Sequence, residues 1–184
     1  ERGNRYLHGY WQSELYFKDI RATLLKELSP RVPALGVNRS VLDEIDSVES
    51  VAVHVRRGDY VADPKVNSVH GTCSLDYYRA AFDRLNARLS SPRYFIFSDD
   101  PAWVKVNLRP DNARYCDHNG PDAGFEDLRL MSRCRHHIIA NSSFSWWGAW
   151  LGTHPEQRVI APARWFAGGT EDTTDLIPAR WERL

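Results

Sequence analysis

The stretch VAVHVRRGDY at residues 51–60 constrains the fold more than any other part of the chain. Its alternating small and β-branched apolar residues predict a short buried strand, which then runs directly into His54, Arg56, Arg57 and Asp59. Adjacent arginines at the end of a buried strand need anionic partners, because an unpaired buried charge is strongly penalised. A phosphate is the natural partner, since guanidinium binds its oxygens through two parallel hydrogen bonds. Ion pairs with local carboxylates are the alternative.

The composition describes one domain without a general affinity for polyanions. A chain of 184 residues suffices for one full domain and is too short for two of ordinary size. Its 24 basic and 24 acidic residues balance, whereas a general binder of nucleic acids or membrane surfaces would have a basic excess. No stretch is apolar for long enough to span a bilayer, so we expect no integral membrane segment and no nucleic-acid partner.

The cysteines and the first residues of the chain are informative about the cellular location of the protein. Cys73, Cys116 and Cys134 have a spacing that fits neither a disulfide framework nor a zinc site. Reduced thiols in a cytoplasm are the simplest explanation, so we expect a cytoplasmic protein of bacterial type, with peripheral membrane attachment as an option for a full-length form. Residues 1–6 contain neither a signal peptide nor an initiator Met, and we interpret the chain as an excerpt of a longer one.

Hydrophobic periodicity predicts an α/β domain with a mainly parallel, Rossmann-like sheet. Between Asp59 and Thr72 the polar residues show no periodicity, which is typical of a mobile binding loop. Helices are expected at residues 10–28, 40–48 (with Ser40 as the cap), 74–89 (with Ser74 as the cap), 101–108, 122–133 and 145–151. Strands are expected at the start of the 51–60 stretch and at residues 93–98, 113–116, 136–141 and 158–161.

Two motifs have competing interpretations. Asp99 and Asp100 could form a metal-binding pair, but Pro101 and the helical run after it favour Asp100 as a helix N-cap. Trp146 and Trp150 could form a sugar-binding platform, but aromatic residues one helical turn apart are more often part of a core. His136 and His137 lack a third ligand at suitable spacing, so we expect no metal site there.

Three polar segments follow the ends of predicted strands: HVRRGD, SDD and NSSFS. Ligands of parallel sheets bind at the carboxyl ends of the strands. In the third segment, the backbone N–H groups of a helix start and the hydroxyls of Ser142 and Ser143 can hold a phosphate, with a simple capping role as the alternative. Convergence of the three segments predicts a nucleotide or pyrophosphate site. The GxGxxG and P-loop patterns are absent, which disfavours a classical NAD site and a P-loop kinase.

Six sequence blocks resemble glycosyltransferase family 11, the α-1,2-fucosyltransferases, and they cover nearly the whole chain in order. The most specific is CRHHIIANSSFSWWGAWL. The blocks are GYWQSELYF (9–17), HVRRGDY (54–60), YFIFSDDPAWVK (94–105), CRHHIIANSSFSWWGAWL (134–151), VIAPARWF (159–166) and DLIPARW (175–181).

This resemblance implies an inverting, metal-independent enzyme with no cofactor that moves L-fucose from GDP-β-L-fucose to the 2-hydroxyl of a terminal β-galactoside. It also implies a GT-B-type architecture of which residues 1–184 are the donor-binding half. Within this single nucleotide-sugar-binding domain, residues 1–50 form a helical lead-in and residues 51–184 the Rossmann-like core. The Gly-rich start and the acceptor-side domain usual in the family are not in this chain.

The resemblance also implies roles for individual residues. Arg56 meets the β-phosphate of the donor with Arg57 close behind it, His54 lies near the ribose or guanine, and Asp127 contacts guanine. The other donor-binding positions stand at strand ends and at the phosphate-binding turn: Ser98, Asp99, Asn141, Ser142, Ser143 and Phe144.

The chemistry of the transfer makes Arg56 the first candidate for catalysis. Cleavage of the bond between the fucosyl carbon and the phosphate oxygen builds negative charge on the leaving diphosphate, which a fixed cation stabilises. Asp59 is the second candidate, but a carboxylate paired with arginine is a poor general base, so we expect it to orient Arg56 or Arg57. The base could lie in the missing half or be unnecessary. A GDP-sugar-binding domain without turnover is the alternative function.

Overall fold

The computed structural model describes residues 4, 6, 8, 11–169 and 171–184. Within them lies a six-stranded sheet of order β3-β2-β1-β4-β5-β6, in which every neighbouring pair is parallel. This is the strand order of a doubly wound Rossmann-like sheet, and it confirms the predicted α/β class. The strands are β1 (Glu49–Val55), β2 (Pro92–Ser98), β3 (Ala113–Tyr115), β4 (His136–Ile138), β5 (Val159–Ala161) and β6 (Glu182–Arg183).

The central strand β1 is buried along almost its whole length, from Ser50 to Val55. It pairs with β2 over seven positions, from Glu49 opposite Pro92 to Val55 opposite Ser98. Strands covered on both faces form near-continuous apolar runs, and this is why the sequence predicts both of them to within two residues.

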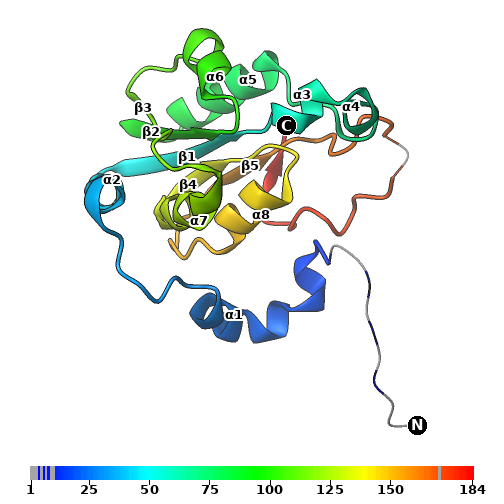
Figure 1. Ribbon diagram of the computed structural model, residues 1–184, viewed down its shortest axis with the longest axis horizontal. Helices are drawn as coiled ribbons and strands as arrows, with labels where there is room; N and C mark the ends of the chain where they lie inside the picture. The colour runs from blue at the N-terminus through cyan, green and yellow to red at the C-terminus, as the bar shows by residue number, and fades with distance from the viewer. Residues whose placement is uncertain (1–3, 5, 7, 9–10, 170) are drawn as a thin grey trace.

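Helices cover both faces of the sheet, as Figure 1 shows. One face carries α5 (Leu75–Asn86) and α6 (Pro101–Asn107), and the other carries α2 (Gly36–Ser47), α7 (Gly124–Arg133) and α8 (Ser143–Trp150). Alternate residues of β1 supply the two cores, with Val51 and Val53 packed toward α5 and Ala52 packed toward α2 and α7. The alternation follows from the two-residue period of a strand.

Local signals specify α5 and α6 well. Ser74 caps α5 by accepting a hydrogen bond from Tyr77 N at 3.1 Å, as predicted. Asp100 caps α6 by accepting from Trp103 N at 3.1 Å, and Pro101 occupies the first turn. The capping interpretation of Asp100 is therefore confirmed.

The helix α8 forms a third core with β5 and the C-terminal tail. Trp146 and Trp150 are fully buried, and their rings stack with centroids 6.2 Å apart. Trp181 from the tail packs against Trp146 at 5.6 Å. These tryptophans belong to the core, as the sequence predicts, and do not form a sugar platform.

Over the described residues, the predicted helix at residues 10–28 is wrong, because the chain there does not form one continuous helix. Two short 3₁₀ turns, Glu14–Tyr16 and Lys18–Ile20, precede α1 (Arg21–Glu27), while Gly9 and Tyr10 lie outside the described residues. Phe17 separates the turns because its φ of −146° is not helical and its ring stacks on Trp147 at 5.2 Å. Packing against α8 therefore overrides the helical periodicity.

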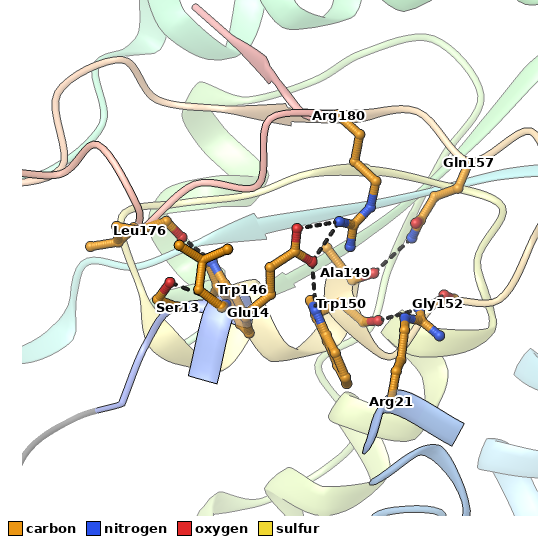
Figure 2. Close-up of polar contacts among 11 residues, drawn as sticks. Ser13, Glu14, Arg21, Trp146, Ala149, Trp150, Gly152, Gln157, Leu176 and Arg180 are labelled. Carbon is orange, nitrogen blue, oxygen red and sulfur yellow. Dashed lines mark hydrogen bonds and ion pairs between the residues drawn. The ribbon is translucent and has the colours of Figure 1, made fainter. Parts of the chain in front are cut away.

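Polar contacts fasten this N-terminal segment to α8 and to the tail (Figure 2). Glu14 accepts hydrogen bonds from Trp150 Nε1 at 3.1 Å and from Arg180 Nη1 at 2.7 Å. Arg21 donates to the carbonyl oxygens of Trp150 and Gly152 at 2.8 and 2.9 Å. The N-terminal segment therefore packs against α8, on the side of the sheet opposite α5.

Three other predictions need correction. Ser40 lies inside α2, because the helix begins at Gly36 and Leu35 takes the cap position. The region between Asp59 and Thr72 is not an unstructured loop: it folds into α3 (Gly58–Ala62) and α4 (Pro64–His70). The two-residue strand β6 is absent from the prediction, because it is too short to show a period.

The remaining 3₁₀ turn, Pro121–Ala123, precedes α7. Over the described ranges, none of the helices combines the length and the apolar character needed to cross a membrane.

Candidate functional site

The sheet has a topological switch point between β1 and β4. The chain proceeds from β1 to β2 and β3 on one side, and from β4 to β5 and β6 on the other. Ligands of doubly wound sheets bind in the crevice at the carboxyl ends of the two strands at this point. Arg56 and Arg57 directly follow β1, and the 139–143 segment directly follows β4. The structure therefore brings the two strongest predicted anion-binding segments to the same edge.

Arg56 is the more available of the two arginines. Its guanidinium pairs with Asp59 at 2.8 Å and with Asp99 at 3.1 Å, and its Cζ lies 5.4 Å from the centroid of the Tyr60 ring. The side chain keeps 33% of its surface exposed. Solvent-exposed ion pairs contribute below about 1 kcal/mol, so a bound phosphate can compete for this guanidinium.

Arg57 is committed to the protein. Its Nε lies 3.2 Å from Asp100 Oδ2, and its guanidinium stacks on Trp103 with Cζ 3.7 Å from the ring centroid. Its backbone N–H donates to Asp99 Oδ1 at 2.8 Å. The alternative interpretation of the arginine pair, local ion pairing, therefore describes Arg57 better than Arg56.

Asp99 holds the turn after β1 together. One oxygen accepts the Arg57 N–H, and the other pairs with Arg56. A Cβ on Gly58 would stand 2.6 Å from Asp99 Oδ2, so a larger residue here would displace the Asp99 carboxylate. Ser98 Oγ accepts from Asp100 N at 3.0 Å and braces the same turn. Donor contacts by Ser98 and Asp99 remain predictions, and the structure shows both residues shaping the turn.

Asp99 and Asp100, at the end of β2, pair with Arg56 and Arg57, and Asp100 also caps the start of α6. Across the described residues there is no group of three or more His, Cys, Asp and Glu side chains arranged to hold a metal ion.

His54 joins β1 to the start of α8. Its ring lies 5.5 Å from that of Phe144, and its side chain is 5% exposed. Burial lowers the pKa of His54 to about 4, with a further lowering from Arg56 and an opposing effect of Asp99. The ring is therefore neutral at pH 7. Its Nδ1 is buried without a hydrogen-bond partner among the described residues.

The start of α8 leaves its backbone N–H groups uncapped by a side chain. Ser142 occupies the N-cap position but makes no capping hydrogen bond, so the simple capping role is not observed. Ser143 is exposed in the first turn, and Phe144 is half-buried. Uncapped N–H groups at a helix start favour an anion. Phosphate binding by Ser142, Ser143 and Phe144 remains a prediction that this geometry allows.

Asn141 has a structural task. Its side chain is buried, and its Nδ2 donates to the carbonyl oxygens of His70 at 2.8 Å and Trp165 at 3.1 Å. Tyr60 Oη also donates to the Asn141 carbonyl at 3.4 Å. Because the amide is engaged by the backbone of two loops, a donor contact by Asn141 remains a prediction.

Asp127 lies in a separate polar cluster with three residues that the sequence analysis missed: Asn38, His118 and Asn119. Asn119 Nδ2 donates to Asp127 Oδ1 at 2.7 Å, and Asn38 bonds both Asn119 at 2.8 Å and His118 Nε2 at 2.8 Å. Burial raises the pKa of Asp127, against the lowering effect of the Asn119 hydrogen bond. Asn38 belongs to α2 and the others to the β3–α7 side, so only the fold brings them together. Contact of Asp127 with guanine remains a prediction.

A cavity of about 390 Å³ lies beside the carboxyl ends of β4 and β5. The loop between α4 and α5 forms one wall, and the segment after β5 forms the other. Its polar and aromatic lining includes His70, Asn141, Arg164 and Phe166. His70, Arg164 and Phe166 were not predicted as site residues, because no local pattern marks them.

The chain folds into a Rossmann-like sheet with a charged edge at its switch point, and comparison with known proteins places it among the glycosyltransferases. The chain belongs to glycosyl transferase family 11, whose family model matches residues 2–177.

Curated relatives agree with this assignment. An α-1,2-colitosyltransferase of Escherichia coli is 36% identical over 184 residues, covering 96% of this chain and 61% of the relative. The O-antigen biosynthesis glycosyltransferase WbnK of Escherichia coli is 35% identical over 68% of this chain and 42% of the relative. A galactoside 2-α-L-fucosyltransferase, Sec1 of Mus musculus, is 31% identical over 78% of this chain and 41% of the relative. The chain thus spans about two fifths to three fifths of these relatives. No solved structure matches significantly.

Proposed function

We propose that this chain binds GDP-β-L-fucose and serves an inverting transfer of L-fucose to the 2-hydroxyl of a terminal β-galactoside. The observation that supports the proposal most is the meeting of Arg56 and the uncapped start of α8 at one switch point. One supplies a guanidinium and the other backbone N–H groups, which together suit a diphosphate. The names of the α-1,2-fucosyltransferase relatives suggest the sugar and the linkage.

In this proposal the donor lies across the edge of the sheet. The nucleoside points toward the Asp127 cluster, the diphosphate lies between Arg56 and α8, and the sugar points toward the cavity beside His70. Arg56 stabilises the negative charge that develops on the leaving diphosphate. Asp59 orients Arg56 through their 2.8 Å ion pair.

A second donor is favoured by one observation. The colitosyltransferase relative aligns with 96% of the chain, more than the fucosyltransferase relatives do, so a donor carrying colitose is the alternative sugar. A further alternative is a GDP-sugar-binding domain without turnover.

Incubation of the purified protein with radiolabelled GDP-fucose and lactose tests the proposal, with GDP-colitose in a parallel reaction and EDTA in matched samples of each. Fucosyl-lactose formation that EDTA does not change supports the proposal. Product from GDP-colitose alone establishes the other donor. GDP binding without either product establishes the domain without turnover, and absence of both binding and product refutes the proposal.

A further inference from the structure

Hydrogen bonds hold together the two walls of the cavity beside the switch point. Asn141 Nδ2 donates to the His70 carbonyl at 2.8 Å from one side and to the Trp165 carbonyl at 3.1 Å from the other. Ala167 N donates to the Val69 carbonyl at 2.8 Å, which ties the two walls together directly. A cavity of about 390 Å³ with such walls is of the size that small ligands occupy.

The ring of His70 is held in one orientation on the wall of this cavity. It stacks on Tyr60 with centroids 4.8 Å apart and planes 9° apart, and it lies 5.8 Å from the Phe166 ring at 38°. Two aromatic neighbours and the fixed backbone leave the imidazole little freedom. Such orientation is what a group needs to transfer a proton in a defined direction.

One nitrogen of this ring lacks a partner within the protein. His70 Nδ1 is buried and accepts or donates no hydrogen bond among the described residues. The other nitrogen, Nε2, is not among the buried unpartnered atoms of the described residues, and His70 lines the cavity.

Tyr60 links His70 to the catalytic edge. The Tyr60 ring stacks on the His70 ring and lies 5.4 Å from Arg56 Cζ. A sugar carbon attached to a diphosphate at Arg56 would therefore lie close to the mouth of this cavity. The imidazole and the guanidinium therefore both pack against the Tyr60 ring.

We propose that His70 is the general base that accepts the proton of the acceptor hydroxyl; this rests on the proposed function. The hydroxyl oxygen bonds to C1 of the donor sugar as its proton passes to the imidazole. The bond between C1 and the phosphate oxygen breaks, and its electron pair leaves with GDP, whose charge Arg56 stabilises. The imidazolium then releases its proton to solvent, and the site returns to its starting state.

The other titratable groups facing His70 suit this task less well. Burial raises the pKa of Cys73 to about 11, and burial also raises the pKa values of Tyr60 and Tyr77. Arg164, on the opposite wall, is permanently cationic. Histidine, by contrast, is the side chain that most often serves as a general base.

The test separates the imidazole nitrogen from the packing of the ring. His70→Phe keeps an aromatic ring against Tyr60 and Phe166 but removes both nitrogens. We expect kcat to fall by about 10²-fold or more, within the range typical of general-base catalysis, while GDP affinity stays within twofold of wild type. His154→Gln, at the opposite edge of the sheet, is the matched control and should keep wild-type kcat.

A further measurement distinguishes catalysis from structure. Added imidazole should partly restore transfer by His70→Ala, whose truncated side chain leaves room for it.

The outcomes are separable. If His70→Phe turns over within threefold of wild type, or loses GDP affinity in parallel with kcat, the assignment of His70 is overturned while the proposed function stands. If the wild-type protein transfers neither fucose nor colitose, the proposed function itself fails and the role of His70 fails with it.

Discussion

The two turns at the switch point are built by opposite means. The turn after β1 is held by ion pairs among half-exposed charges, with Arg56 between Asp59 and Asp99. The turn after β4 is held by buried neutral hydrogen bonds, above all those of Asn141. Charges that stay partly in water can change partners at small cost, whereas buried amides cannot. The first turn is therefore suited to meet a ligand and the second to keep the site in shape.

The largest expected effect comes from removing the available cation of the first turn. Arg56→Ala should lower kcat by about 10²- to 10³-fold, or about 3 to 4 kcal/mol, because the leaving diphosphate loses its preorganised donor. Its free energy of unfolding should change by less than about 1 kcal/mol. Steady-state kinetics and urea denaturation measure the two effects. Near-normal turnover would remove Arg56 from the catalytic role.

The second turn should show the reverse pattern. Asn141→Ala leaves the carbonyl oxygens of His70 and Trp165 without their buried donor, which should lower the free energy of unfolding by about 2 to 3 kcal/mol. Urea denaturation monitored by tryptophan fluorescence measures this loss. Asn107→Ala is the matched control, because this exposed amide donates within its own helix to the Trp103 carbonyl. Equal stability of Asn141→Ala and the control would contradict the contrast between the turns.

Acidification should lower the free energy of unfolding through His54, which is neutral at pH 7. The folded-state pKa of His54 is lowered to about 4 from an ordinary 6.5, so its contribution to stability is complete above pH 6.5. As pH falls from 6.5 toward 4, the unfolded chain binds a proton that the folded chain refuses. Stability should then decline by up to about 1.4 kcal/mol per pH unit from this residue. His137, whose pKa burial also lowers to about 4, adds a similar slope.

Urea midpoints between pH 4 and 7 measure this acid effect. The difference between the wild type and His54→Gln isolates the contribution of His54. A variant with the same pH slope as the wild type would show that His54 does not supply it.

A smaller effect is expected from crowding the first turn. Gly58→Ala places a Cβ against Asp99 Oδ2 and should weaken GDP binding about tenfold, since Asp99 must release Arg56 or Arg57. In an Asp99→Ala background the same substitution should have little effect, because the obstructing oxygen is gone. Calorimetric GDP titration of the four proteins in this cycle provides the comparison, and additive effects would disprove the coupling.

The smallest effect is expected at Asp59. Its ion pair with Arg56 is half-exposed, so Asp59→Asn should change the free energy of unfolding by less than about 1 kcal/mol and kcat by less than tenfold. A loss of kcat as large as that of Arg56→Ala would contradict this minor role. The kcat values of Asp59→Asn and Arg56→Ala, determined side by side, provide the comparison.

Sequence reasoning succeeded where the signal is local. The apolar runs of β1 and β2, the Ser74 and Asp100 caps and the buried tryptophan pair all depend on neighbours within a few residues. The arrival of Arg56 and Ser142 at one edge follows from these elements once the strands are parallel.

Sequence reasoning failed where contacts between distant parts of the chain determine the local structure. Phe17 interrupts a periodic helix because α8 offers it an aromatic surface, and His70 becomes a site residue only when Tyr60 and Phe166 close around it. The polar residues of α3 and α4 lack a strong apolar period, because their helices lie on the surface. The cluster of Asn38 and Asn119 joins positions that are 81 residues apart in sequence.

The ion pairs after β1 also bear on how a charged donor finds the site. Asp59, Asp99 and Asp100 outnumber Arg56 and Arg57, so the turn as a whole offers little positive potential at a distance. Without electrostatic steering, an incoming dianion approaches by ordinary diffusion, and recognition begins only at contact. The association rate should consequently be modest and nearly indifferent to ionic strength, in contrast to sites whose arginines face solvent without counter-charges.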